Sequence, residues 1–255
     1  MGNLYCHNFI AKSDSFAHIY AFMTFADKII QFNKQLDFDG ELPPGIHIMN
    51  PFKENPQVNI LMEQFYKKFY NDNHKRHLIL GINPGRFGGG ITGIPFTDPK
   101  RLKSACGISY NGKETHEPSS VFVYEVIEAY GGTYKFYKDF YIHSIFPLGF
   151  TATTKNGKEV NYNYYDSKEL TCSVYDYIIE NIKKQVAFGV DTDTCFCFGN
   201  GKNEKFLRKL NAKYGFFNNI IALEHPRFIM QYKSRAKAGY IDKYITSFRS
   251  VINNS

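Results

Sequence analysis

Residues 77–96 read HLILGINPGRFGGGITGIPF, an apolar run that passes directly into a loop rich in glycine and proline. The run at 77–82 shows no alternation of polar and apolar residues, which is typical of a strand buried on both faces of a parallel sheet. Glycine and proline then exclude a regular helix directly after the strand. This stretch therefore predicts a buried parallel strand whose carboxyl end opens into an irregular loop.

The loop contains a formal G-x-G-x-x-G pattern in Gly88, Gly90 and Gly93. In dinucleotide-binding proteins these glycines form the turn directly after the strand and a helix begins within the pattern. Here the residues from 83 to 87 separate strand and glycines, and prolines follow at 95 and 99. The dinucleotide interpretation is therefore weak, and a glycine-rich surface turn is a second alternative.

The rest of the chain alternates short apolar runs with amphipathic segments. Strands that alternate with helices are joined by right-handed crossovers and form a mostly parallel sheet with helices on both faces. The predicted fold is α/β, a three-layer α/β/α sandwich around a central, mostly parallel four-stranded sheet with an N-terminal helical lead-in. We expect one domain, with the lead-in at 1–75 and the α/β core at 76–255. Strands are expected at 77–82, 140–145, 194–198 and 219–223, and helices at 15–36 (capped by Ser15), 57–70, 117–130, 167–188, 202–213 and about 231–252.

The composition is that of a globular protein with a sizeable core. Of 255 residues 43% are hydrophobic and 22% are charged, values that exclude a disordered chain, a collagen-like repeat and a coiled coil. The formal net charge of +7 permits a polyanionic partner without requiring one. The aromatic share is 17%, so rings must fill much of the core.

The cysteines indicate a reducing compartment, and the N-terminal sequence does not resemble an export signal. The five cysteines form no disulfide framework and no CxxC pair, and there is no HExxH motif, so we expect neither disulfides nor a metal site. Neither a secretory signal nor a run long enough to span a membrane is evident. We expect a cytoplasmic protein, nucleoid-associated if prokaryotic, that acts as a monomer.

Four unusual loops follow the predicted strands. In parallel sheets the ligand sits at the carboxyl ends of the strands, so these loops are where a site is expected. They span residues 83–96, 144–163, 199–202 and 224–230.

The first of these loops resembles a known family. GINPGRFGGGITGIPF (81–96) is similar to the first motif of the uracil-DNA glycosylase superfamily, in its single-strand-selective monofunctional branch. IHIMNP (46–51) and residues 117–122 are similar to further family segments, the latter to an S-E-V-S-G-like stretch. YIHSIFPL (141–148) is similar to the family's F-V-H-N-L-C-P-L strand end, and EHP (224–226) falls where the family has M-H-P-S-P. Together they cover roughly residues 20–250.

The resemblance implies a monofunctional DNA glycosylase of base-excision repair, which hydrolyses the N-glycosidic bond of uracil or a related deaminated base. DNA would be the partner, with the damaged base flipped into a pocket. No metal and no organic cofactor are implied. By resemblance Asn83 positions the attacking water and His225 stabilises the departing base, whereas His143 is structural. The alternatives are a turn-forming Asn before proline and a structural His225.

The same resemblance places Ile82, Gly85, Phe96 and Ser144 around the flipped base. Gly85 lacks a side chain, so the backbone can approach the base closely. Phe96 would stack on the base, although packing in the core is an equal alternative for this ring.

Two departures from the family pattern bear on specificity. Ser144 stands where the family has an Asn whose amide reads the polar edge of uracil, and a hydroxyl cannot supply a paired donor and acceptor. Base choice should therefore be relaxed unless Asn161 or Asn163 compensates. The H-P-S-P loop is replaced by His-Pro-Arg-Phe, and we expect Arg227 and Phe228 to form a DNA-contacting wedge, the alternative being an apolar helix start.

Positive charge is concentrated near two of the four loops. Residues 227–249 carry six Lys or Arg against one Asp, and residues 202–213 carry five against one Glu. Lys233 and Arg235 are therefore candidates for contacts to DNA phosphates, although solvated helix faces would look the same. A non-catalytic DNA-binding module and a nucleotide-binding enzyme are the remaining functional alternatives.

Overall fold

The fold is built on a four-stranded parallel sheet in a computed structural model, which describes residues 23–112 and 114–252. The strands are β2 (His77–Gly81), β3 (Phe140–Ser144), β6 (Asp191–Phe198) and β7 (Asn219–Leu223), in the spatial order β3-β2-β6-β7. All three pairings are parallel. The carboxyl ends of β2 and β3 lie side by side, because Gly81 is in register with Ser144.

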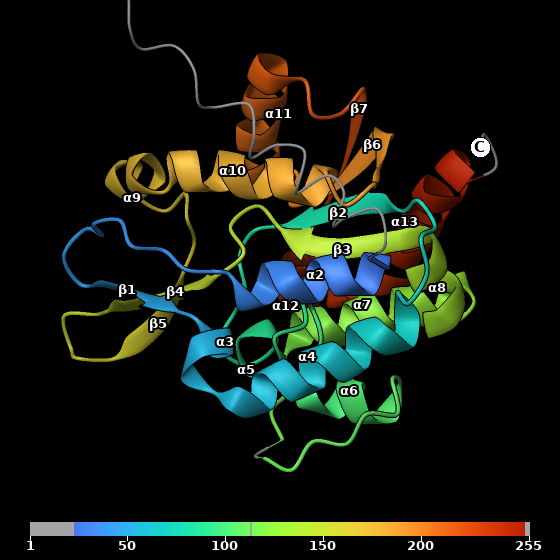
Figure 1. The fold of residues 1–255 in the computed structure, drawn as a ribbon, viewed down its shortest axis with the longest axis horizontal. Coiled ribbons are helices and arrows are strands. Elements are labelled where there is room, and N and C mark those ends of the chain that lie inside the picture. The colour runs from blue at the N-terminus through green and yellow to red at the C-terminus, as the bar shows by residue number, and fades with distance from the viewer. Residues whose placement is uncertain (1–22, 113, 253–255) are drawn as a thin grey trace, which may run out of the picture.

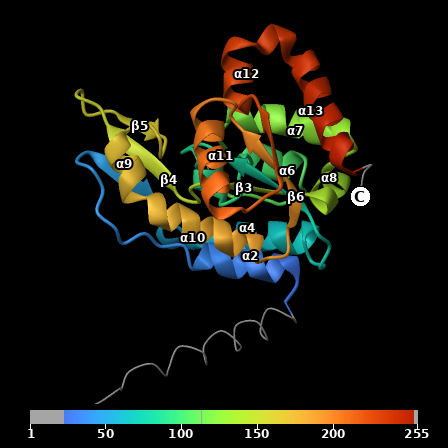
Figure 2. The same cartoon turned by 90° about the horizontal axis from the view of Figure 1, so that it is seen from above.

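Helices cover both faces of this sheet, as Figures 1 and 2 show. On one face Phe25 of α2 (Phe25–Lys34) contacts Tyr141 at 5.4 Å between ring centroids. On the other, Phe248 of α13 (Lys237–Ile252) contacts Phe140 at 4.6 Å. Adjacent residues of β3 thus face opposite helical layers, as the alternation of side chains along a strand requires. The predicted three-layer α/β/α fold is confirmed.

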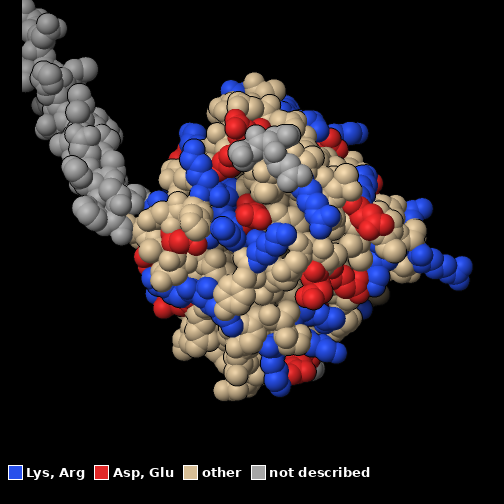
Figure 3. Space-filling model, turned by 90° about the vertical axis from the view of Figure 1, so that its right-hand side faces the viewer, with Lys and Arg blue, Asp and Glu red and all other residues tan. Residues whose placement is uncertain are grey.

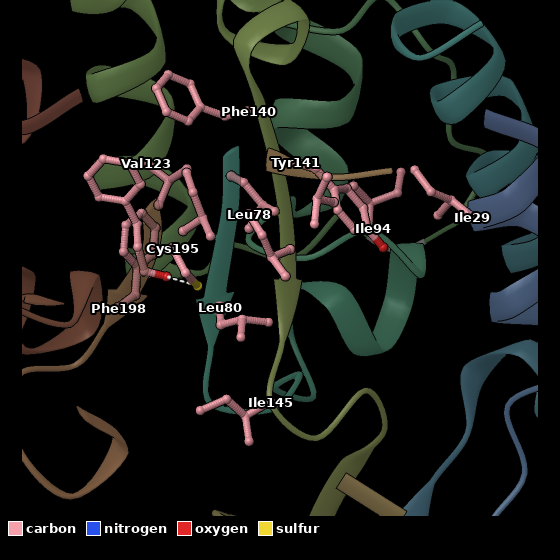
Figure 4. Close-up of a cluster of buried hydrophobic side chains, with 14 of the residues drawn as sticks. Ile29, Leu78, Leu80, Ile94, Val123, Phe140, Tyr141, Ile145, Cys195 and Phe198 are labelled. Carbon is pink, nitrogen blue, oxygen red and sulfur yellow. Dashed lines mark hydrogen bonds between the residues drawn. The ribbon is translucent and has the colours of Figure 1, made fainter. Parts of the chain in front are cut away.

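The core between the layers consists of closely packed, buried side chains. Side chains from β2, β3 and β6 are almost completely buried, and Figure 4 shows them converging from the strands. Leu78, Leu80 and Cys195 are each 0% exposed. A strand with both faces covered is mostly apolar, which explains the lack of polar-apolar alternation in the run at 78–81.

Several helix boundaries differ from those predicted. The first helix begins at Phe25, and a capping box in which Thr24 and Asp27 exchange hydrogen bonds fixes its start. The predicted residues 15–22, with Ser15, lie outside the described residues. The predicted helix at 167–188 is wrong as one element, because α9 (Lys168–Ser173) and α10 (Tyr175–Val186) meet at Val174.

The last predicted helix, 231–252, is also wrong as one element. α12 (Pro226–Tyr232) begins five residues earlier and ends where Lys233 leaves the helical conformation at φ −129°. The turn η1 (Ser234–Ala236) then leads into α13. Proline at the first position of α12 favours a helix start, because its fixed φ fits and no amide donor is needed there.

A second, smaller sheet includes part of the segment 144–163, which the sequence analysis gave as a loop. The antiparallel strands β1 (Ile46–Met49), β4 (Gly149–Thr153) and β5 (Glu159–Tyr162) pair in the order β1-β4-β5. The loop prediction failed because β4 and β5 are short, and because β4 also pairs with β1 across about a hundred residues, which no local pattern reveals. The remaining helices are α3 (Pro51–Glu54), α4 (Pro56–Phe69), α5 (Gly89–Thr92), α6 (Pro99–Ser104), α7 (Pro118–Tyr130), α8 (Thr133–Asp139) and α11 (Lys202–Tyr214).

Charged residues of both signs share the surface. Figure 3, which faces the side of α13 and the C-terminal end, shows Lys and Arg interspersed with Asp and Glu on this side of the molecule. Lys243 is ion-paired with Glu224 at 2.8 Å and Arg208 with Glu204 at 2.8 Å. A minor part of the positive charge counted near α11 and α13 is therefore locally compensated. Across the described ranges no helix is both long and apolar enough to cross a bilayer.

Candidate active site

A pocket of about 340 Å³ opens at the carboxyl ends of the central strands. It brings together residues that the sequence places far apart: the loop after β2, the end of β3, the segment after β5 and the start of α12. Lys233 and Arg235 are exposed beyond α12 and do not line it. The predicted site residues that do are Ile82, Asn83, Gly85, Phe96, Ser144, His225, Arg227 and Phe228.

His225 caps helix α12 from the wall of the pocket. Its Nδ1 accepts a hydrogen bond from the backbone amide of Arg227 at 3.1 Å. Burial, and to a lesser extent the neighbouring Arg227 charge, lowers the pKa of the imidazole to about 4. The ring is therefore neutral at pH 7, and because Nδ1 is an acceptor its proton sits on Nε2. The imidazole can thus offer one N–H donor without carrying a positive charge.

Phe96 lies against His225 on a strained backbone. Its φ is +54°, the only positive value among described residues other than glycine, and such strain persists where surrounding structure enforces it. The ring packs on Gly81, where a β-carbon would lie 2.8 Å from it, and stands 5.8 Å from the His225 ring. It is half-buried and lines the pocket. Core packing and pocket lining are thus both true of Phe96.

Asn83 ties the loop after β2 to the segment after β5. Its Nδ2 donates to the carbonyl oxygen of Tyr162 at 3.1 Å, and its Oδ1 accepts from the amide of Tyr164 at 3.2 Å. These two bonds fix the orientation of the amide. The carbonyl oxygen keeps a second lone pair, since one hydrogen bond occupies only half of its capacity.

Glu117 is a pocket residue that the sequence reasoning did not single out for the site. Its carboxylate faces the glycine loop, and a β-carbon on Gly88 would overlap it. Its backbone amide donates to the buried carboxylate of Asp98 at 2.9 Å, which holds the segment in place. Burial, then the Asp98 charge, raises the pKa of Glu117 to about 7, against the opposing effect of Arg227. The similarity of residues 117–122 to a family segment was the signal that could have pointed to Glu117.

Three polar side chains line the pocket near the loop after β2. Ser144 is 3% exposed, and no described residue hydrogen-bonds its hydroxyl. The side-chain oxygen of Asn161 already has hydrogen-bond partners, because Oδ1 accepts from the backbone amide and from Nε of Arg86 at 3.2 Å each. The backbone N–H of Asn163 donates to the carboxylate of Asp166 at 2.9 Å, whereas its side-chain amide has no hydrogen-bond partner among the described residues.

Aromatic side chains stand at the rim on α12. Phe228 is 41% exposed and Tyr232 65% exposed, and their ring centroids are 5.6 Å apart. The apolar helix start expected as an alternative for Phe228 is observed, yet the ring faces solvent at the pocket rim. Exposed aromatic rings grouped around a cavity are typical of an interaction surface. Tyr232 follows Phe228 by one helical turn, a signal that the sequence offered.

No group of three His, Cys, Asp or Glu side chains in the described part of the chain is arranged to hold a metal ion.

Comparison with known proteins shows the class to which this protein belongs. The sequence model of the uracil DNA glycosylase superfamily matches residues 67–249, and the chain belongs to this superfamily. It is a DNA glycosylase, a hydrolase of base-excision repair with DNA as its substrate.

A solved structure provides a more specific comparison. The chain is similar to wild-type SMUG2 from Pedobacter heparinus, with 66% sequence identity and a TM-score of 0.89. The match covers 92% of this chain and 100% of that one. No match was found among curated proteins.

Proposed function

We propose that this chain removes uracil or a related deaminated base from DNA, with a water positioned by Asn83 and the leaving base stabilised by His225. The observation that carries the proposal is the His225 ring. It lines the pocket, is neutral at pH 7, and has its proton on Nε2 because Nδ1 accepts from Arg227.

The leaving group requires a donor that does not disappear near neutral pH. As the N-glycosidic bond breaks, the electron pair stays with the base and negative charge develops on its oxygen atoms. A fixed neutral N–H stabilises that charge, and donors of this kind typically contribute 10²–10³ in rate. The pKa of about 4 keeps His225 in this form throughout the physiological range.

The water requires an acceptor that holds it in place. Asn83 is held by Tyr162 and Tyr164, and its Oδ1 retains a lone pair for a water. An amide is too weak a base to remove the proton early, so the water attacks a sugar carbon that already carries positive charge. No lysine stands among the described residues that line the pocket, which supports hydrolysis by water rather than attack by an amine.

The base would be bound by stacking and by a small set of polar groups. Phe96 supplies a π-face, Gly85 gives access to the backbone, and Ile82 adds an apolar wall. Ser144 and Asn163 have uncommitted hydrogen-bonding groups. A rotatable hydroxyl and a free amide fit more than one deaminated base, so we propose relaxed selectivity. We also propose that the protein acts as a monomer.

Release of free base tests the proposal. Single-stranded and duplex oligonucleotides that contain uracil, xanthine, hypoxanthine or 5-hydroxymethyluracil are incubated with the protein, and the released base is measured by mass spectrometry. We expect release of at least one base, and its loss in Asn83→Ala and His225→Ala. Tyr134→Ala, on α8 and away from the pocket, serves as the control. Absence of release from all substrates would overturn the proposal.

A further inference from the structure

A second cavity of about 460 Å³ adjoins the base pocket. It lies between the loop after β2, the β4–β5 hairpin, the start of α7 and α12. Its size falls in the range of about 300–1,000 Å³ that small-molecule sites occupy. The two cavities are adjacent, since both are lined by Glu117, Ser119, Asn161, Arg227 and Gln231.

An aromatic ring stands open to solvent at this second cavity. Phe87 is 49% exposed, although apolar rings of this size are ordinarily covered. The loop that carries it is fixed, because the Thr115 hydroxyl donates to the Phe87 carbonyl oxygen at 2.6 Å. Arg86 lies over the ring at 5.1 Å. Arg86 is itself held by Asn161 and by Glu159, each at 3.2 Å, so ring and guanidinium form a preorganised platform.

Two cations of the second cavity remain available for a ligand. Lys158 on the β4–β5 hairpin and Arg227 on α12 both line it and are exposed. Within the described residues neither side chain has a hydrogen-bond or ion-pair partner, and Arg227 acts on Glu117 only through its longer-range charge. The carboxylate of Glu159 is already paired with Arg86. Glu117 also lines the cavity, but its raised pKa leaves it partly protonated near neutral pH, so the net free charge here is positive.

An exposed π-face beside uncommitted cations matches one ligand chemistry: a nucleotide, with a planar base and an anionic phosphate. We propose that the second cavity binds an unpaired nucleotide adjacent to the excised one, with its base on Phe87 and its phosphate between Lys158 and Arg227. This inference rests on the proposed function, because that function places a nucleotide of the same strand in the neighbouring pocket. Because the two cavities are adjacent, neighbouring nucleotides of one strand could occupy them.

A binding cycle tests the subsite without relying on excision. The probe is a single-stranded oligonucleotide with 2′-fluoro-deoxyuridine at the target position, since the fluorine resists formation of the sugar cation. It is compared with versions that lack the base on the 5′ or the 3′ neighbour. Dissociation constants are measured by fluorescence anisotropy for the wild type, Phe87→Ala, Phe87→Tyr and the control Tyr134→Ala.

We expect loss of one neighbouring base to weaken wild-type binding by about 5- to 150-fold, the range for stacking a single base. Phe87→Ala should lose a similar factor on the intact probe and become insensitive to that neighbour. Phe87→Tyr keeps a ring and should retain the sensitivity. Lys158→Ala should reduce the slope of log affinity against log salt by about 0.7, as for one phosphate of a single strand.

The inference is overturned if neither neighbouring base affects wild-type binding, or if Phe87→Ala stays as sensitive as the wild type. Excision of uracil by the same preparations is measured in parallel. If the protein excises a base but the effect of the neighbouring base does not depend on Phe87, only the subsite is rejected. If that effect depends on Phe87 but no tested base is excised, the proposed function is rejected and the subsite is retained.

Discussion

Glu117 occupies the space that a side chain at Gly85 would enter: a β-carbon there would lie 2.9 Å from Oε1 of Glu117. The absence of a side chain at Gly85 therefore makes room for a carboxyl group where the two cavities adjoin. The position is poorly hydrated, and burial is the main reason why the pKa of Glu117 rises to about 7.

This carboxyl group should make stability depend on pH. The folded-state pKa of about 7 lies above the ordinary 4.5, so the folded protein binds more protons between these values and loses stability as pH rises through them. In the wild type this titration should lower the free energy of unfolding by a value on the order of 2 kcal/mol between pH 5 and pH 8, and Glu117→Gln should abolish that decrease. Urea unfolding at both pH values measures it, with the exposed Glu159→Gln as control. An unchanged pH dependence in Glu117→Gln would show that the group titrates normally.

His225→Ala should lower the single-turnover excision rate by about 10²–10³, the usual loss for one donor to a developing anion. Oligonucleotide affinity should change much less. Because the pKa of His225 is lowered to about 4, wild-type rates should show no histidine titration between pH 6 and pH 8. A folded variant with the wild-type rate would remove His225 from the mechanism.

Salt dependence separates cations that contact DNA from those on solvated helices. Arg227→Ala, at the junction of the cavities, should weaken binding of all sequences and flatten the salt slope by about one unit or slightly less. Lys233→Ala and Arg235→Ala test whether the exposed segment after α12 also tracks phosphates. Lys243→Ala is the comparison, because Lys243 is paired with Glu224 and should leave the slope unchanged. A wild-type slope near zero would argue against a nucleic-acid partner.

Ser144→Asn should shift excision towards uracil. The wild-type hydroxyl can rotate to donate or accept, so we expect uracil and a second deaminated base such as xanthine or hypoxanthine to be removed at comparable rates. The amide should restore a fixed donor and acceptor, and mismatched bases should then leave unpaired groups that cost about 1–3 kcal/mol each. Single-turnover rates on matched oligonucleotides measure the ratio.

Asn163→Ala is the companion variant. If Asn163 reads the base, its loss should change the ratio while Ser144→Asn has little effect. If the wild type already removes uracil alone and Ser144→Asn changes nothing, Ser144 does not set base choice.

The central sheet could be predicted from the sequence. The strands at 77–81, 140–144 and 219–223 lie within the predicted ranges, because strands covered by helices on both faces are mostly apolar and so stand out as short apolar runs. Ordered motifs at the strand ends also indicated the family, and most predicted pocket residues do meet in one cavity. Local chemistry and chain order were sufficient for both.

The contacts between segments distant in the sequence are visible only in the tertiary structure. β1 pairs with β4 across about a hundred residues, and this hairpin sheet brings Lys158 and Asn161 to the glycine loop. The His225 tautomer follows from a bond to Arg227, and the environment of Glu117 from its packing against Gly85 and Gly88. Such properties depend on which atoms are neighbours in space, and burial and hydrogen bonding then set charge state and orientation, which a linear pattern does not record.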